Sequence, residues 1–393
     1  MSGVWLATVL VHGWLVFEAN LNPVTAPFND VNLYGYWADQ VLSGFGILGV
    51  NQPWVYPFLA LGPILFAKWL GSSLGMMTGW LILACLLNGI ALSALVDWGS
   101  ASRAAFKSAG YYLAFIALLG PVAIGRIDLA ATFLAILGFV QVYHRRFRIA
   151  VVLFTLGAWV KIWPIAATLA LVSSVKSRLS FVFAAVITAV SVLTFGAISG
   201  GNQNLISFLT MQGNRGLQIE SVAATFWVWA AKFGAPGAGI YFDNQLVTNQ
   251  VAGAFTSEVS SALGFVMVVA LLITLWLSIR AFKAGANTQH LFVITFLTGT
   301  LDLIVFNKVG SPQFELWLAV PLMAGVLLGV PRWRLPLVSG LGIALATNLL
   351  YPIYYMDLMA LGSLGVWLLT LRNLGLVLLL IWANLRLSRL AVV

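Results

Sequence analysis

The sequence predicts an all-α integral membrane protein, a bundle of about twelve transmembrane helices with interfacial helices in its outer loops. Hydrophobic residues make up 61% of the 393 residues and charged residues only 8%. A soluble domain carries roughly 25% charged residues, so this chain has too few charges to cover a water-exposed surface. Apolar stretches of about 18 to 25 residues, the length that a membrane-crossing helix needs, recur along the whole chain. No long polar segment interrupts them, so we expect residues 1–393 to form a single polytopic membrane domain.

The apolar runs mark the expected spans in order. The run at Met1–Phe17 lacks a basic front end and a clear cleavage site, so we interpret it as the first span and not as a signal peptide. Clear later examples are Thr78–Val96, Phe181–Ile198, Ala262–Ile279 and Leu374–Leu385 with its flanks. The single cysteine, Cys85, lies inside such a run and excludes an intrachain disulfide.

Basic residues gather in short breaks between the apolar runs. The breaks contain Arg103 and Lys107, Arg145, Arg146 and Arg148, Lys176 and Arg178, Arg280 and Lys283, Arg332 and Arg334, and Arg386 and Arg389. The positive-inside rule places all six in the cytoplasm, and it explains the net charge of +9 without a nucleic-acid partner. Each pair of successive breaks must then be separated by an even number of crossings.

That condition assigns the ambiguous apolar segments. Tyr56–Leu70 and Tyr351–Leu371 both begin with Tyr-Pro, which favours a break in a spanning helix. We expect both to be short re-entrant or surface helices on the outer face, with Arg372 near the outer end of the last span. Both termini are then cytoplasmic.

Acidic residues provide an independent check on this threading. Asp97 is the only acid on the expected cytoplasmic side, and the other ten lie at or near the outer face. Two outer segments, 18–77 and 199–261, are long. We therefore expect the polar chemistry on the extracytoplasmic face of a plasma (inner) membrane. His12, His144 and His290 are far apart and show no metal-ligand spacing, so we expect neither a metal nor another cofactor.

Asp30 is the first candidate for chemistry. It lies in the first outer loop, just before an amphipathic stretch, Val31–Leu42, which suits a helix lying flat on the membrane. A carboxylate at the interface can accept a proton from a substrate hydroxyl. Aspartate also caps helices well, so a purely structural N-cap is the alternative.

Four cations lie in or near the outer face. Arg126 is followed closely by Asp128, and the two can pair with each other or face a ligand. Lys161 interrupts an apolar run just before Pro164, and an ionisable group at that depth is more often functional than decorative. Its natural partner is a buried carboxylate or an anionic ligand such as phosphate.

Two further outer turns contribute the remaining cations. One turn, Arg215–Ser221, supplies Arg215, and the other, Asn307–Phe314, supplies Lys308. Each turn is alternatively an ordinary solvated loop. Together with Arg126 and Lys161, these cations suit a lipid-linked phosphate.

Ordered landmarks along nearly the whole chain resemble those of the GT-C superfamily of membrane glycosyltransferases. The closest resemblance is to glycosyltransferase family 87, which includes an actinobacterial phosphatidylinositol-mannoside mannosyltransferase. The landmarks are Asp30 with Tyr34, Tyr56-Pro57, Gly125–Asp128, Lys161 with Pro164, Arg215–Ser221, and Ser311-Pro312-Gln313 before Trp317. The resemblance implies a GT-C-type bundle and an inverting sugar transfer at the outer face.

The resemblance also implies residue roles. Asp30 would act as the general base on an acceptor hydroxyl, and Arg126, Lys161, Arg215 and Lys308 would bind the donor phosphate. Residues expected to contact substrates are Tyr34, Trp37, Tyr56, Asp128, Trp163, Gln218, Glu220, Ser221 and Gln313. The expected partners are a polyprenyl-phosphate sugar donor, with mannose as the expected sugar, a glycolipid or glycan acceptor, and the bilayer.

The sequence departs from the family pattern at two points. Phe58 stands where the family usually has a second proline, and no histidine lies in a late outer loop. The alternative function is a lipid or solute transporter or flippase, which would place ionisable groups along a pathway that reaches both faces.

Overall fold

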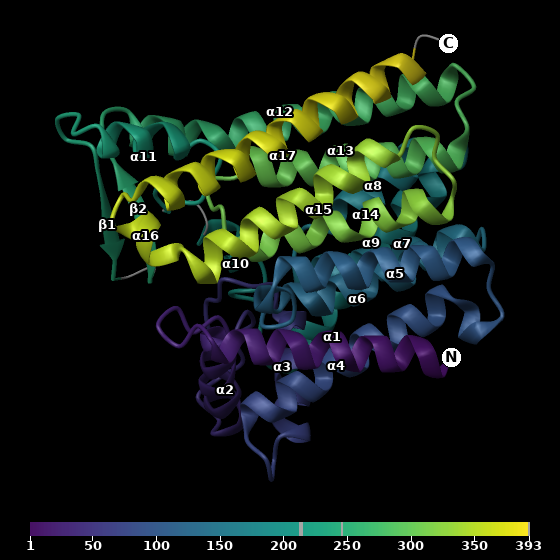
Figure 1. Cartoon of the computed structure of the whole chain (residues 1–393). Coiled ribbons are helices and arrows are strands. Elements are labelled where there is room, and N and C mark those ends of the chain that lie inside the picture. The colour runs from purple at the N-terminus through teal and green to yellow at the C-terminus, as the bar shows by residue number, and fades with distance from the viewer. Residues whose placement is uncertain (212–214, 245–246, 392–393) are drawn as a thin grey trace.

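The computed structural model describes residues 1–211, 215–244 and 247–391, and it is predominantly helical. The long helices run roughly parallel to one axis (Figure 1). Both termini lie at one end of this bundle, and α2, α16 and a short β-hairpin lie at the other end (Figure 1). Termini that share one end agree with the even number of crossings expected from the basic residues.

Seven helices in the described part of the chain are long and apolar enough to cross a membrane. They are α1 (Ser2–Asn20), α4 (Met76–Leu95), α9 (Arg178–Gly200), α12 (Thr256–Lys283), α13 (Thr288–Val305), α15 (Arg334–Asn348) with the π-helical turn Leu349–Ile353, and α17 (Ser363–Leu390). These helices make the chain a multi-pass membrane protein.

Shorter helices fill the remainder of the bundle. They are α3 (Leu61–Leu70), α5 (Arg103–Leu119), α6 (Asp128–Tyr143), α7 (Phe147–Val160), α8 (Ile165–Ser173) and α14 (Leu316–Leu327). Single 3-10 turns lie at Phe58–Ala60, Asp97–Gly99, Pro121–Ala123 and Pro312–Glu315. Several of these helices are shorter than the roughly 20 residues that a full crossing needs, so the expected count of about twelve stays a prediction.

The segment predicted as the first outer loop, residues 18–77, corresponds to the region between two long helices. It lies between the end of α1 at Asn20 and the start of α4 at Met76. Its first helix, α2 (Asn29–Leu42), covers the predicted amphipathic stretch and runs across the end of the bundle, transverse to the long helices (Figure 1). The segment predicted at Tyr56–Leu70 is a 3-10 turn followed by α3, which has only 10 residues and packs against α4.

The segment predicted as the second outer loop, residues 199–261, contains elements that the sequence did not indicate. Between α9 and α12 lie α10 (Ser207–Thr210), α11 (Thr225–Lys232) and an antiparallel hairpin of β1 (Gly239–Asp243) and β2 (Thr248–Ala252). The register pairs Gly239 with Ala252 and Asp243 with Thr248. This hairpin is a local departure from the all-helical expectation.

The segment predicted at Tyr351–Leu371 is not a separate helix over its whole length. A turn and a short helix, α16 (Tyr355–Met359), occupy only its first part. From Ser363 the chain enters α17, which continues without a break for 28 residues. Arg372 lies inside this helix, nine residues after its first residue, and its position near the outer end of the last span stays a prediction.

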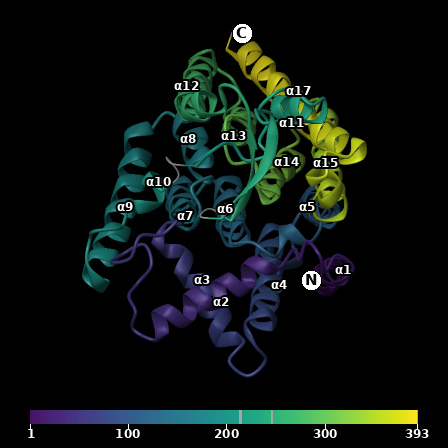
Figure 2. The same cartoon turned by 90° about the vertical axis from the view of Figure 1, so that its left-hand side faces the viewer.

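The core is centred on α13, where every residue from Leu291 to Val305 is buried. Figure 2 shows α13 and α14 near the middle of the bundle, with α9, α1 and α17 at its periphery. Exposed apolar side chains such as Leu179, Phe183 and Phe265 cover α9 and α12, as expected for lipid-facing helices.

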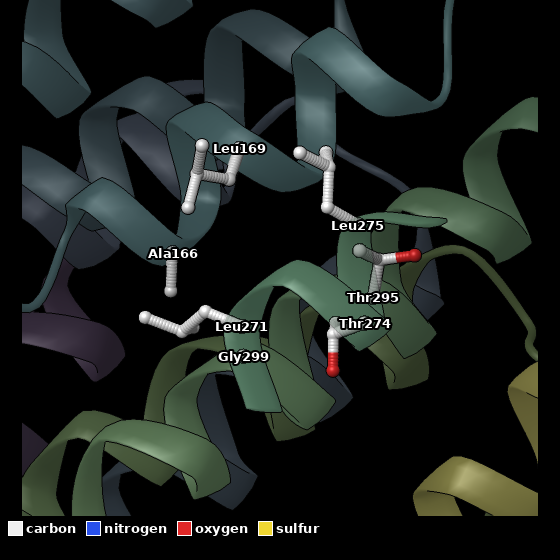
Figure 3. A pocket seen from close by; sticks show the side chains of 7 residues that line it. All are labelled: Ala166, Leu169, Leu271, Thr274, Leu275, Thr295 and Gly299. Carbon is white, nitrogen blue, oxygen red and sulfur yellow. The ribbon is translucent and has the colours of Figure 1, made fainter. Parts of the chain in front are cut away.

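Packing between α8, α12 and α13 is nearly complete. It leaves a cavity of about 10 Å³ between these three helices (Figure 3). The cavity is lined by Ala166, Leu169, Leu271, Thr274, Leu275, Thr295 and Gly299. A space of this size holds one water molecule at most, so it belongs to the core and is not a substrate site.

Candidate functional site

Most of the polar residues singled out in the sequence gather at the end of the bundle that carries α2 and the hairpin. Four charged groups are joined there in two ion pairs, and we call them the charged cluster: Asp30, Arg126, Asp128 and Lys161. They come from the start of α2, the turn before α6, the start of α6 and the end of α7. Residues far apart in the sequence thus meet because several helices begin or end at this level.

Asp30 pairs with Arg126. The Arg126 Nε lies 3.2 Å from Asp30 Oδ2, and the side chains are 8% and 35% exposed, respectively. Asp30 is the second residue of α2 and makes no capping hydrogen bond, since Phe28 occupies the N-cap position. The structural alternative for Asp30, a helix cap, is therefore wrong. Its carboxylate is fixed by a buried guanidinium but keeps a face open to a ligand.

The turn before α6 is shaped to receive the first outer loop. Arg126 Nη1 donates to the Pro27 carbonyl at 2.9 Å. A Cβ on Gly125 would lie 2.6 Å from Phe28 Cδ1 and 3.3 Å from the Pro27 carbonyl oxygen. Glycine is therefore required here for a close approach of two segments. The sequence Gly-Arg next to this loop positions Arg126 toward Asp30.

Asp128 pairs with Lys161 and not with Arg126. Lys161 Nζ lies 3.6 Å from Asp128 Oδ2, and Trp317 Nε1 donates to Asp128 Oδ1 at 2.8 Å. The Asp128 side chain is only 1% exposed. The alternative that Arg126 and Asp128 form a local pair is therefore wrong. Asp128 is a buried anchor for Lys161, and α6 begins at this residue, where a helix dipole favours a carboxylate.

Lys161 is also surrounded by aromatic rings. Its Nζ lies 4.5 Å from the centre of the Tyr56 ring and 5.7 Å from that of Phe314. Burial lowers the pKa of Lys161, Asp128 raises it, and the nearby Arg215 lowers it further. Lys161 is thus paired with one buried carboxylate and is near a second cation. An added negative charge would be attracted to both cations, so this position suits an anionic ligand.

Tyr34 and Tyr56 complete the wall of the cluster. The backbone N–H of Ile127 donates to the Tyr34 hydroxyl at 3.0 Å, which ties α2 to the turn before α6. The Trp37 ring packs against Tyr34 and, edge to face, against Tyr56. Burial raises the pKa of both tyrosines above the ordinary value, so both remain neutral hydrogen-bonding groups. The predicted residues Tyr34, Trp37 and Tyr56 therefore do lie together.

Arg215 lies near Lys161 of the cluster and near Lys308. Arg215 is close enough to lower the pKa of both Lys161 and Lys308, although burial is the larger cause for each lysine. Burial also lowers the pKa of Arg215 itself, while Tyr56 and Asp243 raise it. Three of the four predicted cations, Lys161, Arg215 and Lys308, are thus linked electrostatically through Arg215.

A second group of predicted residues forms a neighbouring polar network. Gln218 Nε2 donates to the Glu220 carboxylate at 2.8 Å, and Ser311 Oγ reaches Gln218 Oε1 at 3.5 Å. Glu220 and Ser221 are buried, at 3% and 1% exposure. The interpretation of Arg215–Ser221 as a solvated loop is therefore wrong for its second half.

The two turns predicted to lie on the outer face are in direct backbone contact. The Gln218 N–H donates to the Lys308 carbonyl at 3.0 Å. A Cβ on Gly310 would lie 2.2 Å from the Ser221 nitrogen, so only glycine permits this approach. Gln313 is buried in the same turn region, in the 3-10 segment Pro312–Glu315.

Arg372 holds this network from inside α17, and sequence reasoning missed this role. Its Nη1 lies 3.3 Å from Glu315 Oε1, its Nη2 donates to the Glu220 carbonyl, and its Nε donates to Asn373 Oδ1. Both charged side chains are almost fully buried, at 1% and 2% exposure. The rule that singled out Lys161, an ionisable residue inside an apolar run, applies equally to Arg372 and would have found it.

Trp163 does not join the polar groups. It is fully buried and stacks between Phe296 and Trp317, with ring centres 6.2 Å and 5.9 Å away. It supports Trp317, the hydrogen-bond donor to Asp128, and is part of the core. Across residues 1–211, 215–244 and 247–391, no group of three or more His, Cys, Asp or Glu side chains is arranged to hold a metal ion.

The site as a whole combines one half-open carboxylate with several buried or half-buried cations. A carboxylate in this position can accept a proton, and the cations can stabilise an anionic leaving group. No known protein family, curated protein or solved structure matches the chain.

Proposed function

We propose that the chain is a GT-C-type membrane glycosyltransferase that transfers a sugar, with mannose as the expected one, from a polyprenyl-phosphate donor. The acceptor is a glycolipid or glycan, and transfer occurs with inversion at the outer membrane face. The observation that carries the proposal is the position of Asp30, whose carboxylate is held by Arg126 beside Lys161. The resemblance to glycosyltransferase family 87 supports the same proposal.

In the proposed reaction, Asp30 accepts the proton of an acceptor hydroxyl. The hydroxyl oxygen forms a bond to the anomeric carbon, and the bond from that carbon to the phosphate oxygen breaks. The electron pair leaves with polyprenyl phosphate, and cations stabilise this developing charge. Arg126 fixes Asp30 Oδ2, so Oδ1 is the oxygen available to the acceptor.

A bound phosphate is best accommodated by Lys161, Arg215 and Lys308. Lys161 forms an ion pair with one carboxylate, that of Asp128, and is repelled by the positive charge of Arg215. A negatively charged phosphate between them would relieve this repulsion. The membrane would deliver the lipid donor sideways to this end of the bundle, because the polyprenyl chain remains in the bilayer.

The test is a transfer assay with the purified full-length protein. Labelled polyprenyl-phosphate sugars and a membrane lipid extract are supplied, and labelled glycolipid product is measured. Asp30→Asn should lower the rate by about 100-fold or more, the usual contribution of a general base. The matched control is Asp39→Asn, because Asp39 lies on the same helix and pairs with Lys68 through an exposed contact of 2.7 Å.

Two results would overturn the proposal. The first is an Asp30→Asn variant that is as active as the control. The second is movement of a lipid or solute across liposome membranes without any transfer product, which would favour the transporter alternative.

A further inference from the structure

A second cavity lies at the end of the bundle opposite the charged cluster. It has a volume of about 520 Å³ and is lined by Arg145, Phe147, Val175, Lys176, Ser177, Phe181, Phe282, Asn287, Thr288 and Gln289. Helix α7 runs from this cavity at Phe147 to the cluster at Lys161, and α8 returns from the cluster to this end. The two sites are therefore separated by about 20 Å, the length of the 14-residue helix α7.

Three of the basic breaks that are far apart in the sequence meet around this cavity. Arg145 precedes α7, and Lys176 lies between α8 and α9. The third break is at the end of α12, where Phe282, which lies between Arg280 and Lys283 in the sequence, lines the cavity. Arg178 stacks on Phe282, with its guanidinium carbon 5.1 Å from the ring centre. The lining contains two cations and no carboxylate, so its charge is complementary to an anion.

Neither lining cation has a carboxylate partner in the described part of the chain. The four ion pairs found there involve Lys68, Arg126, Lys161 and Arg372. Arg145 and Lys176 are both exposed. Their charges are thus available to a ligand, and each can donate hydrogen bonds to phosphate oxygens.

The apolar part of the lining indicates what kind of anion fits. Phe147 and Phe181 meet edge to face, and Phe282 adds a third ring. A free inorganic anion gains nothing from three aromatic walls, whereas a lipid headgroup continues into glycerol and acyl chains. Asn287 and Gln289 add amide groups to the lining.

The level of the cavity in the bundle also suits a lipid. Lys176 and Ser177 come just before the start of α9, Phe282 lies at the end of α12, and Asn287 comes just before α13. These three helices are among the candidate spans, so the cavity lies where their membrane-crossing parts end. Headgroup phosphates occupy this level in a bilayer.

The outer faces of α9 and α12 can receive acyl chains. Leu179, in the first turn of α9, is 85% exposed, and Phe183 one turn later is 66% exposed. Basic pockets between helices on the cytoplasmic side bind phosphorylated lipid headgroups by the same combination of charge and apolar surface. We propose that this cavity is a binding site for the headgroup phosphate of an anionic glycerophospholipid in the leaflet predicted to be cytoplasmic.

The experiment is a lipid titration of the purified full-length protein in detergent micelles, read by native mass spectrometry. The probes are dioleoyl-phosphatidylglycerol, which is anionic, and dioleoyl-phosphatidylcholine, which has no net charge. A basic residue near an anionic surface contributes about fivefold in affinity. Because both lining cations are exposed, we expect Arg145→Gln with Lys176→Gln to weaken phosphatidylglycerol binding about tenfold.

The matched control is Arg148→Gln with Lys283→Gln. Both residues are exposed, lie at the same end of the bundle, and remove the same charge, but neither lines the cavity. We expect this control to change phosphatidylglycerol binding by less than about twofold, since exposed charges outside the site are screened by salt. If both double variants bind phosphatidylglycerol equally weakly, the effect comes from general surface charge, and the proposal is overturned.

A second variant tests the cavity without altering charge. Ser177→Trp places a large ring at the exposed rim of the cavity and should also weaken phosphatidylglycerol binding. This variant keeps the proposal testable if the double variant does not fold. Unchanged phosphatidylglycerol binding by Ser177→Trp would contradict the proposal.

A final arm distinguishes a lipid from a free anion. Millimolar inorganic phosphate should not displace phosphatidylglycerol from the protein. Full displacement by inorganic phosphate, or equal affinity for phosphatidylcholine, would show that the cavity does not recognise an anionic lipid headgroup.

Discussion

Lys161 Nζ lies 3.6 Å from Asp128 Oδ2, and the other oxygen of this buried carboxylate accepts a hydrogen bond from Trp317. The pair joins the end of α7 to the start of α6 at the level where Asp30 and Arg126 also meet. A cation and a carboxylate with such low exposure depend on each other, because removal of either leaves an uncompensated charge.

We therefore expect Lys161→Met to destabilise the protein by about 3 kcal/mol or more, since Asp128 would remain buried without its cation. The double variant Lys161→Met with Asp128→Asn should recover a large part of this loss. The measurement is thermal unfolding in detergent micelles. The control is Lys68→Met, which breaks the exposed pair with Asp39 and should cost about 1 kcal/mol or less. Equal losses for Lys68→Met and Lys161→Met would contradict the role of burial.

Arg372 should not tolerate lysine. Its guanidinium contacts Glu315, the Glu220 carbonyl and Asn373 at once, and a single ammonium cannot reach all three groups. We expect Arg372→Lys to lower the free energy of unfolding by about 2 kcal/mol. The measurement is denaturant- or heat-induced unfolding of the purified protein. Arg389→Lys, an exposed change in the last turn of the same helix, should have almost no effect. A similar free energy of unfolding for both variants would show that the network does not depend on Arg372.

Gly310 should be required for the contact between the two outer turns. A Cβ at this position would lie 2.2 Å from the Ser221 nitrogen, so the backbone must move to admit it. We expect Gly310→Ala to destabilise the protein by about 1–3 kcal/mol, as overpacking usually does. Gly342→Ala is the control, because a Cβ there meets nothing within 4 Å and alanine favours the helix. If thermal unfolding shows the same change for both variants, the close approach of the turns is not needed for stability.

Glu220 should make stability depend on pH. Burial raises its pKa from 4.5 to about 7, although Arg372, Gln218 and Arg126 act in the opposite direction. Below about pH 4.5 the carboxyl is protonated in both the folded and the unfolded protein. Between that pH and 7 the unfolded chain loses its proton first, so the free energy of unfolding falls as pH rises.

The expected loss from Glu220 is at most about 3 kcal/mol between pH 4.5 and 8. Glu220→Gln should flatten this part of the profile, whereas Glu258→Gln, an exposed change at the start of α12, should leave it unchanged. The measurement is the unfolding temperature of each variant over this pH range. A Glu220→Gln profile that falls as steeply as that of the unchanged protein would assign the dependence to other groups.

The sequence by itself determined the class of the fold and the approximate layout of the chain. The bounds 18–77 of the first outer segment differ by only a few residues from the ends of α1 and α4. Hydropathy determines the fold class and these bounds, because the burial of a segment in lipid depends on its apolar content. That content is visible in the sequence itself. The clustering of Asp30, Arg126 and Lys161 at one end followed from the same layout.

The tertiary structure alone decided which charges pair. Arg126 and Asp128 are two residues apart in the sequence, yet Arg126 pairs with Asp30 and Asp128 pairs with Lys161. Arg372 lies buried inside α17, and its partner Glu315 comes from a different element, the 3-10 turn before α14. Pairing depends on which helix ends meet and on which side chains point toward each other. A pattern read along one chain contains no such information, because each partner comes from a different helix.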